Sequence, residues 1–267
     1  MLREPAVAGT FYPANPSRLR QEVENYLQPS AAKVEAIGVI SPHAGYMYSG
    51  HVAGAVLSRI EIPDKVIVLC PNHTGAGAYA AINQYGSWNT PLGEAPIDAH
   101  LARRLVELVP WLEEDSAAHR REHALEVQLP FLQVVHPGFS FVPLCLSHFR
   151  LGECQSLGEG LAQLIQESEE KILIVASSDM NHYESQERTL FKDQRAIDAV
   201  LSLDPERLYR TVHEEHISMC GIIPATCMLT AAKKLGASSA ELVKHATSGD
   251  VSGDYSGVVG YAGIVVS

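Results

Sequence analysis

The chain has 267 residues, of which 46% are hydrophobic and 19% are charged, so it holds enough apolar material for a folded core and too little charge for a disordered protein. It carries 20 Lys and Arg against 31 Asp and Glu, which gives a formal net charge of -11 at pH 7. Phosphate backbones repel a protein this acidic, and this argues against nucleic acid as its main partner.

The cysteines and the apolar runs indicate the compartment in which the protein works. Its five cysteines are an odd number without paired spacing, so they do not form a disulfide framework. No apolar run approaches the length of a membrane span, and the first residues lack the basic and apolar regions of a signal peptide. We therefore expect a cytoplasmic protein with reduced thiols and no membrane partner.

Strand-like and helix-like segments alternate along the chain. The predicted strands, which are short and apolar, are Val34–Ile40, Lys65–Cys70, Ser140–Leu146, Lys171–Ala176, Glu241–Ala246 and Gly257–Val266. The predicted helices, which have apolar residues at helical spacing, are His51–Ile60, Asp98–Leu108, Leu151–Glu167, Leu190–Leu203, Pro205–His213 and Gly221–Leu235. Because this alternation has no internal repeat or linker-like break, we expect a single α/β domain over residues 1–267, with a mainly parallel central sheet flanked by helices.

Three of the predicted strands are followed by histidines. His43 comes shortly after the first strand, His73 after the second, and Asp179 and His182 after Lys171–Ala176. Ligands of open α/β sheets bind outside the carboxyl ends of the strands, and neutral imidazoles gathered there suit a borderline transition-metal ion. A single histidine in such a loop is usually a capping or surface residue. Three histidines at equivalent positions favour a metal site.

Cys220 directly precedes the predicted helix Gly221–Leu235. The dipole and the free N–H groups of a helix N-terminus stabilise a thiolate, so this cysteine is either a metal ligand or a nucleophile. The plainer alternative is a small buried hydrophobic residue. Cys70, Cys145 and Cys227 lie within apolar runs, and we expect them in the core.

Two further polar segments allow more than one interpretation. If Arg121–Pro130 is helical, Glu122 and Glu126 lie on one face with His123 beside them, an arrangement that suits support of a ligand or a helix cap. The segment does not have the His-Glu-x-x-His pattern of a zinc site. Thr247–Tyr255 is rich in Gly, Ser and Asp, and it is either a loop over the site or a surface turn.

Seven short segments match one known family, in order and over nearly the whole chain. They are Ala8–Pro13, Pro42–Tyr46, Pro71–His73, Glu122–Glu126, Ser177–His182, Cys220–Gly221 and Thr247–Tyr255. On these motifs the sequence resembles the Memo family, and most closely its prokaryotic branch, the AmmeMemoRadiSam system protein B. The resemblance implies a fold shared with the class III extradiol dioxygenases, in which two histidines and a glutamate hold Fe(II) and another histidine acts as acid and base.

The resemblance also implies roles for individual residues. His43 and His73 correspond to the two histidine ligands, and Cys220 corresponds to the third ligand position. His182 corresponds to the acid/base histidine, and Asp179 is its expected orienting partner in the same turn. A thiolate in place of a carboxylate counts against ring cleavage, because it is a softer and more strongly donating ligand. Fe(II) is the expected metal, with copper and zinc as alternatives.

The remaining expectations concern the surroundings of the site. Five residues are expected to bind substrate or to support the ligands, namely Phe11, Tyr46, His123, Glu126 and Asp250. The resemblance implies a small-molecule or peptide substrate, and it implies an AMMECR1-like protein and a radical-SAM protein as partners.

Three functions are compatible with these residues. The leading hypothesis is a non-haem iron-dependent redox enzyme with a His/His/Cys metal site. The second is a metal-binding or peptide-binding scaffold that keeps the pocket without turnover. The third is a hydrolase or transferase in which Cys220 is the nucleophile and His43 or His182 is its base.

Overall fold

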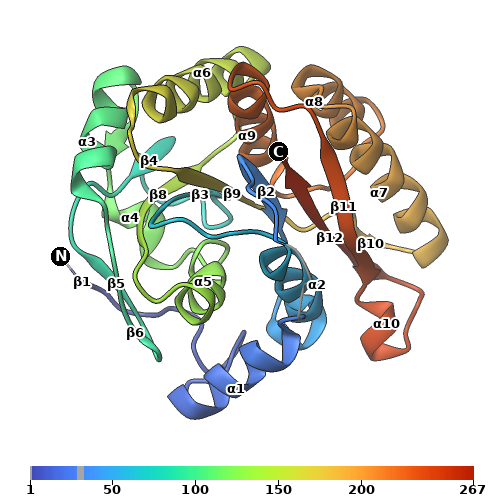
Figure 1. Cartoon of the computed structure of the whole chain (residues 1–267). Coiled ribbons are helices and arrows are strands. Elements are labelled where there is room, and N and C mark those ends of the chain that lie inside the picture. Colours follow the sequence, from blue (N-terminus) through green and yellow to red (C-terminus); the bar gives the residue numbers. More distant parts are fainter. Residues whose placement is uncertain (1, 29–32) are drawn as a thin grey trace.

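Four parallel strands form the centre of the molecule. In the computed structural model, which describes residues 2–28 and 33–267, they lie side by side in the order β2 (Gly38–Ser41), β9 (Ile172–Ser177), β3 (Lys65–Pro71) and β8 (Ser140–Leu146) (Figure 1). β9 and β3 run in parallel register, so their carboxyl ends lie at the same edge of the sheet. The loops that the sequence identifies as candidate site segments leave the sheet at this edge.

Shorter or antiparallel strands extend this centre on both sides. Next to β2 lies β12 (Val258–Val266), which also pairs with β10 (His182–Glu184) and β11 (Ala240–Thr247), always antiparallel. Next to β8 lies β4 (Ala80–Ile82), followed by β7 (Glu113–Glu114). The predicted single α/β domain is confirmed, and its sheet is parallel at the centre and mixed overall. β11 and β12 pair antiparallel because a short connection joins them, whereas a parallel pair needs a long crossover.

A smaller sheet lies at one edge of the molecule, at the left of Figure 1. It consists of three strands, β1 (Leu2–Arg3), β5 (Ser87–Thr90) and β6 (Gly93–Pro96). Three short helical segments connect the larger elements, namely α4 (Ser116–Arg120), the 3-10 turn η1 (Glu126–Gln128) and α10 (Gly249–Ser252).

Helices cover both faces of the large sheet (Figure 1). One face is covered by α3 (Ala99–Leu108), α6 (Leu151–Glu167), α7 (Gln186–Leu201), α8 (Pro205–Glu214) and α9 (Ile222–Lys234). The other face is covered by α1 (Pro16–Tyr26), α2 (Tyr46–Ser58) and α5 (Leu129–Val135). Along β3, Ile67 packs into the first core and Val66 and Val68 pack into the second. A strand that is buried on both faces in this way is apolar throughout, which is why the sequence of β3 does not alternate.

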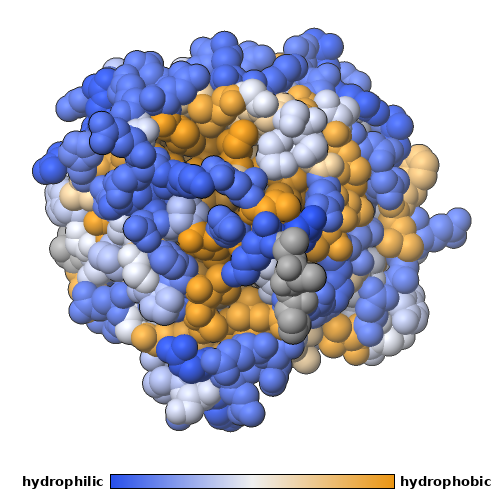
Figure 2. All heavy atoms as spheres, in the orientation of Figure 1, coloured by the Kyte–Doolittle hydropathy of each residue, from blue (hydrophilic) through white to orange (hydrophobic). Residues whose placement is uncertain are grey.

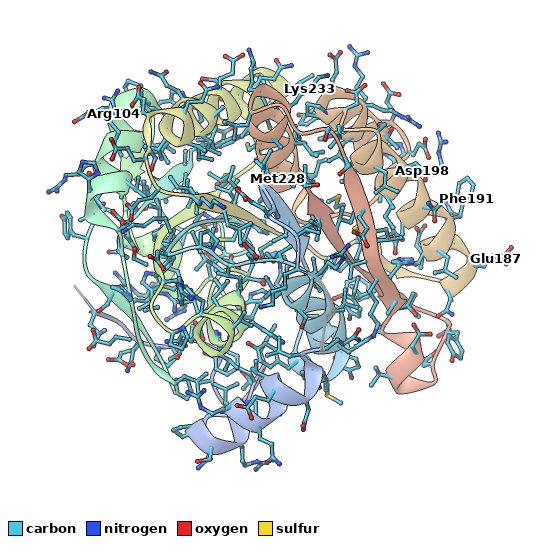
Figure 3. The ribbon with its side chains drawn as sticks, in the orientation of Figure 1. Arg104, Glu187, Phe191, Asp198, Met228 and Lys233 are labelled. Atoms are coloured by element: carbon cyan, nitrogen blue, oxygen red, sulfur yellow. The ribbon has the colours of Figure 1, made fainter. Side chains whose placement is uncertain are left out.

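The side chains follow the same division between inside and outside. Figure 3 shows Met228 of α9 pointing towards the sheet, where a side chain on Gly38 of β2 would collide with it, whereas Arg104 and Lys233 lie at the periphery. Figure 2 shows a largely hydrophilic rim, with apolar residues at the surface in the middle of this face. Among the described residues, no helix combines the length and the apolar character that crossing a lipid bilayer requires.

Every strand and helix that the sequence predicts is present, and some ends differ. β8 and α6 have the predicted bounds, and Asp98, the first residue of the predicted helix, caps α3 by accepting two backbone N–H groups with its carboxylate. The first strand is shorter than expected, because Val34 makes only an isolated bridge to Ile60 and regular pairing begins at Gly38. α2 begins at Tyr46, earlier than the predicted His51.

The helix that we considered for Arg121–Pro130 is wrong. α4 ends at Arg120, residues 121–125 are not helical, and a helical path resumes only in η1 and α5. The side chain of Glu122 accepts a hydrogen bond from the backbone N–H of Ala124 at 2.9 Å, a local bond that competes with helix formation. Glu122 and Glu126 therefore do not share a helix face, and their side chains have different partners.

Candidate metal centre

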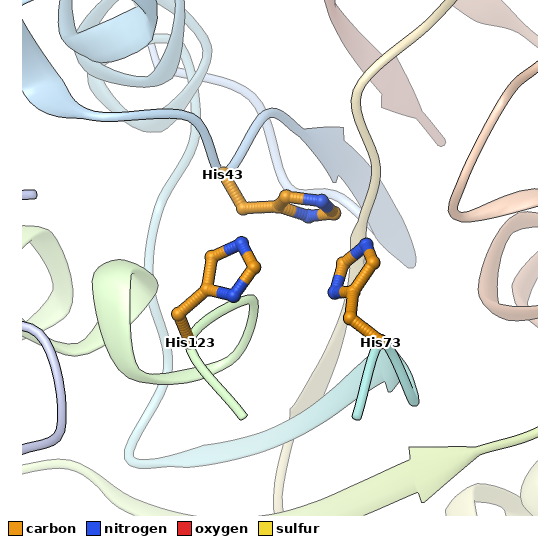
Figure 4. Close-up of side chains that lie close together, drawn as sticks. All are labelled: His43, His73 and His123. Atoms are coloured by element: carbon orange, nitrogen blue, oxygen red, sulfur yellow. The ribbon is translucent and has the colours of Figure 1, made fainter. Parts of the chain in front are cut away.

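Three histidines from separate segments converge at the carboxyl edge of the sheet. His43 follows β2, His73 follows β3, and His123 lies in the non-helical segment before η1. One potential ligand atom from each lies within 4.8 Å of the other two, and Figure 4 shows the three rings facing one another. The ring centroids of His43 and His73 are 5.1 Å apart, and those of His73 and His123 are 4.8 Å apart. This cluster can hold a metal ion.

Glu122 fixes the orientation of His73. Its buried carboxylate accepts hydrogen bonds from Nδ1 of His73 at 2.9 Å and from the backbone N–H of His73 at 2.6 Å. A carboxylate can only accept, so Nδ1 carries the proton and Nε2 keeps a lone pair that is suited to a metal ion. Burial alone would lower the pKa of His73, but the hydrogen bond and the charge of Glu122 raise it above its usual value. Burial raises the pKa of Glu122, and the partnership with His73 outweighs this and lowers it.

A hydroxyl group fixes the orientation of His43. Ser177 Oγ lies 2.9 Å from Nδ1 of His43, and it donates its own proton to the Ala124 carbonyl at 2.6 Å. It also accepts a hydrogen bond from the amide of Gln128 at 2.9 Å. With its proton already donated, Ser177 must accept from His43, so Nδ1 is again the protonated nitrogen and Nε2 has the free lone pair. Burial, followed by the nearby histidines, holds the pKa of His43 well below its usual value.

Cys220 borders the cluster through His43. Its Sγ lies 3.1 Å from Nε2 of His43 and accepts a hydrogen bond from the backbone N–H of Asp179 at 3.2 Å. The next residue, Gly221, caps α9 and packs so closely that an added Cβ would lie 2.3 Å from Cβ of Ser178. A larger residue there would push Cys220 away from the site. Burial, followed by the charge of Asp179, raises the pKa of the Cys220 thiol well above its usual value.

The structure adds a residue to the predicted set. Cys220, the predicted third ligand, borders the cluster through its contact with His43. His123 is predicted as an outer residue, and it is a member of the cluster. The sequence signal for His123 is weak, because this residue does not follow a strand and because its segment resembles a helix.

Asp179 and His182 do not orient each other. Oδ1 of Asp179 accepts the backbone N–H groups of His43 and Ala44, at 2.7 and 3.3 Å, and burial raises the pKa of Asp179 to about 7. Nδ1 of His182 instead donates to the Ser218 carbonyl at 2.8 Å, and the backbone N–H of His182 donates to Ser218 Oγ. Among the described hydrogen bonds, Nδ1 of His182 is paired with the Ser218 carbonyl and Asp179 with backbone N–H groups, so the expected orienting contact is not one of them. Burial is the largest influence and lowers the pKa of His182, against the opposing backbone hydrogen bonds of Ser218 and Met180, so the neutral ring is favoured.

Three other predicted residues lie in different surroundings. The ring of Phe11 packs against His123, with centroids 4.7 Å apart, so it forms part of the wall. Tyr46 is buried in the core, and its hydroxyl donates to the Val127 carbonyl at 2.7 Å. Asp250 lies in the exposed part of α10 and accepts the backbone N–H of Thr247.

Glu126 ties the N-terminal segment to the site. Its fully buried carboxylate pairs with Arg3 at 2.7 Å and accepts the Tyr12 hydroxyl at 2.6 Å and two backbone N–H groups between these residues. Because Phe11 belongs to the same segment, these bonds hold its ring against His123. Glu126 thus acts on the wall of the cluster rather than on the histidines themselves.

Comparison with known proteins adds a family to this geometry. A family model described as "Memo-like protein" matches residues 3–265. A MEMO1 family protein of Methanopyrus kandleri is 41% identical over 279 residues, covering 99% of each chain. MEMO1 family proteins of Methanococcoides burtonii and Thermotoga neapolitana are 42% and 41% identical, covering 99% and 100% of this chain and 100% of each relative. The solved structure of the uncharacterized protein JW3007 from Escherichia coli K12 shares the fold, with a TM-score of 0.56, 15% identity, and coverage of 85% of this chain and 98% of that chain.

Proposed function

This chain belongs to the Memo-like protein family, and on that premise we propose that it is a redox enzyme that holds iron with His43, His73 and Cys220. The observation that carries the proposal is the pair of oriented imidazoles. In both His43 and His73 a hydrogen bond occupies Nδ1, which leaves Nε2 unprotonated. Cys220 Sγ lies against one of these two nitrogens, at 3.1 Å.

The donor set suits the proposed metal. Neutral imidazoles and a thiol are ligands for iron, copper and zinc, whereas magnesium and calcium prefer oxygen ligands. Burial keeps the thiol of Cys220 protonated in the metal-free protein, so metal binding would release its proton. His123 stacks on His73 with an interplanar angle of 21° and supports the site. Bound there, Fe(II) would supply the redox chemistry.

His182 is the proposed acid/base residue. The Ser218 carbonyl holds its Nδ1 proton, so Nε2 is the atom that accepts a proton from a bound small molecule or peptide. The charge of His182 lowers the pKa of His43 and the charge of His73 lowers the pKa of His182, which supports a role for His182 near the cluster. Phe11 gives the substrate an apolar wall on the side of His123.

Elemental analysis of anaerobically purified protein tests the ligand set. We expect iron in the wild type, its loss in His43→Ala and Cys220→Ala, and unchanged iron in His100→Ala, which removes an exposed histidine of α3. Unchanged iron in Cys220→Ala together with loss in His123→Ala would replace the proposed set with three histidines. Oxygen uptake by the iron-loaded protein tests turnover: sustained uptake linked to a product supports an enzyme, and its absence with retained peptide binding supports a scaffold instead.

The contact between Cys220 and His43 favours a second candidate, a hydrolase or transferase with a cysteine nucleophile. A thiol and an imidazole nitrogen at 3.1 Å are the pair that such chemistry uses. The raised pKa of the thiol opposes it, because the nucleophile is the thiolate. Iodoacetamide labelling separates the two candidates. Labelling of Cys220 that bound metal does not prevent supports the nucleophile, and protection by metal supports the ligand.

A further inference from the structure

A cavity of about 650 Å³ lies beside the small sheet, and none of the three clustered histidines lines it. Its walls come from β1, from β5, from α4 and from the residues near the ends of β4 and β7. This volume falls within the range of small-molecule sites. The cavity is therefore large enough to hold a ligand of its own.

Two buried polar side chains in its wall have ring nitrogens that make no hydrogen bond of normal geometry with the described residues, although the backbone of Ala81 interacts with one of them, His119. Trp88 and His119 line the cavity, and each is only 1% exposed. Within the described part of the chain, neither Nε1 of Trp88 nor either ring nitrogen of His119 makes a hydrogen bond of normal geometry. Buried polar groups of this kind are usually satisfied, since leaving them unpaired costs free energy. This wall keeps unused hydrogen-bonding capacity.

Two arginines stand at the rim of the same cavity. Arg120 and Arg121 are exposed, and among residues 2–28 and 33–267 neither makes an ion pair or a side-chain hydrogen bond. Two acidic residues also line the cavity: Glu4 accepts from the side chain of Asn89 at 3.1 Å, and Glu114 accepts a backbone N–H at 2.7 Å. Adjacent unpaired arginines at a cavity are unusual in a chain of net charge -11, and guanidinium groups match carboxylates and phosphates.

We propose that this cavity binds a small organic anion, with its carboxylate or phosphate on Arg120 and Arg121 and its remainder against the wall formed by Trp88 and His119. The floor of the site is already rigid. Arg3 lies over the Trp88 ring, with its guanidinium carbon 4.0 Å from the centroid, and its Nε donates to the His119 carbonyl at 2.7 Å. The ligand therefore enters a preformed site, which lowers the entropy cost of binding.

The same arginine connects this site to the metal centre. Nη2 of Arg3 donates to the backbone carbonyl of Glu122 at 2.8 Å, and the side chain of Glu122 orients His73. An anion that packs on the Arg3 and Trp88 wall is thus separated from a clustered histidine by two residues. The anion site itself does not depend on which metal or reaction the histidines support.

Titration of chelator-treated protein with citrate and with pyrophosphate tests the proposal, because these probes carry the two anionic groups without a bound metal to compete for them. The chain has two tryptophans, so Trp111→Phe leaves Trp88 as the sole reporter, and calorimetry on the wild type gives a second measurement. We expect saturable binding of at least one probe with a change in Trp88 fluorescence. Binding of citrate alone or of pyrophosphate alone identifies the anionic group that the site prefers.

A pair of charge-matched variants separates specific binding from general attraction. We expect Arg120→Gln/Arg121→Gln to weaken binding at least about tenfold. Arg20→Gln/Arg103→Gln, which removes two exposed arginines that do not line the cavity, should change it by less than about twofold. Failure of both probes to saturate, equal weakening in both double variants, or loss of binding in His43→Ala would each overturn the proposal.

Discussion

His43 and His73 occupy the same position after two parallel strands, β2 and β3, that flank β9, but the protein supports them in different ways. A neutral hydroxyl, that of Ser177, holds the ring of His43, whereas a carboxylate, that of Glu122, holds the ring of His73. The pKa of His43 is well below its usual value because of burial, and the pKa of His73 is raised by its carboxylate. Equivalent backbone positions therefore give one histidine that stays neutral and one that competes for protons.

This difference gives the two histidines different properties as ligands: His43 is held by Ser177, and His73 is held by Glu122. A carboxylate behind an imidazole makes the imidazole a stronger donor, and it also makes protonation easier. A neutral hydroxyl fixes the ring without making the imidazole easier to protonate. Variants of Glu122 and Ser177 test whether the two supports differ in strength, and the pH dependence of metal binding tests whether they differ in proton competition.

Glu122→Ala has the largest expected effect. It removes the partner of His73 Nδ1 and takes the carboxylate acceptor away from the backbone N–H groups of His73 and Ala124. We expect metal affinity to fall by about 100-fold and stability to fall by about 3 kcal/mol. Competition with a chromophoric chelator and urea unfolding measure the two quantities. Wild-type affinity in a folded variant would mean that His73 does not need its carboxylate.

Ser177→Ala has a smaller expected effect, because a neutral hydrogen bond is weaker than one to a carboxylate. It removes the acceptor for His43 Nδ1, and we expect metal affinity to fall by about tenfold. Ser41→Ala is a matched control at the end of the neighbouring strand, since the buried hydroxyl of Ser41 has no hydrogen-bond partner among the described residues. Equal losses of metal affinity in Ser177→Ala and Ser41→Ala would mean that the hydrogen bond between Ser177 and His43 does not set the affinity.

The two halves of the site also differ in how they respond to pH. Metal binding requires neutral imidazoles and, with Cys220 as a ligand, a thiolate. Because the pKa of the thiol is raised, its proton competes with the metal throughout, and affinity falls more steeply once the pH drops through the raised pKa of His73. His43 does not contribute in this window, since its pKa lies well below the usual value. Glu122→Gln removes the charge that raises the pKa of His73, so the midpoint should move to lower pH. Chelator competition at a series of pH values measures the midpoint, and an unchanged midpoint would assign the proton competition to another group.

The sequence predicts the residues of this site that are positioned by the ends of strands. It does not predict those that are positioned by side-chain hydrogen bonds to distant residues. His43 and His73 are predictable because parallel strands end at one edge of the sheet. His123 is not, since its segment has helical spacing, and local side-chain bonds such as that from Ala124 to Glu122 compete with the helix. The role of Arg3 is also invisible in the sequence, because its partners lie more than a hundred residues away.

Ser218→Ala has the smallest expected effect on the metal and tests whether His182 is separate from it. Ser218 holds His182 in two ways, through its carbonyl and through its hydroxyl, and the substitution removes only the hydroxyl. The carbonyl still fixes the Nδ1 proton, so we expect metal affinity to change by less than about twofold and stability to fall by about 1 kcal/mol. Calorimetric metal titration and urea unfolding measure these quantities. A loss of metal affinity comparable to that of Ser177→Ala would make His182 part of the metal site. Ser218 would then be a third residue, besides Ser177 and Glu122, that supports a metal-binding histidine.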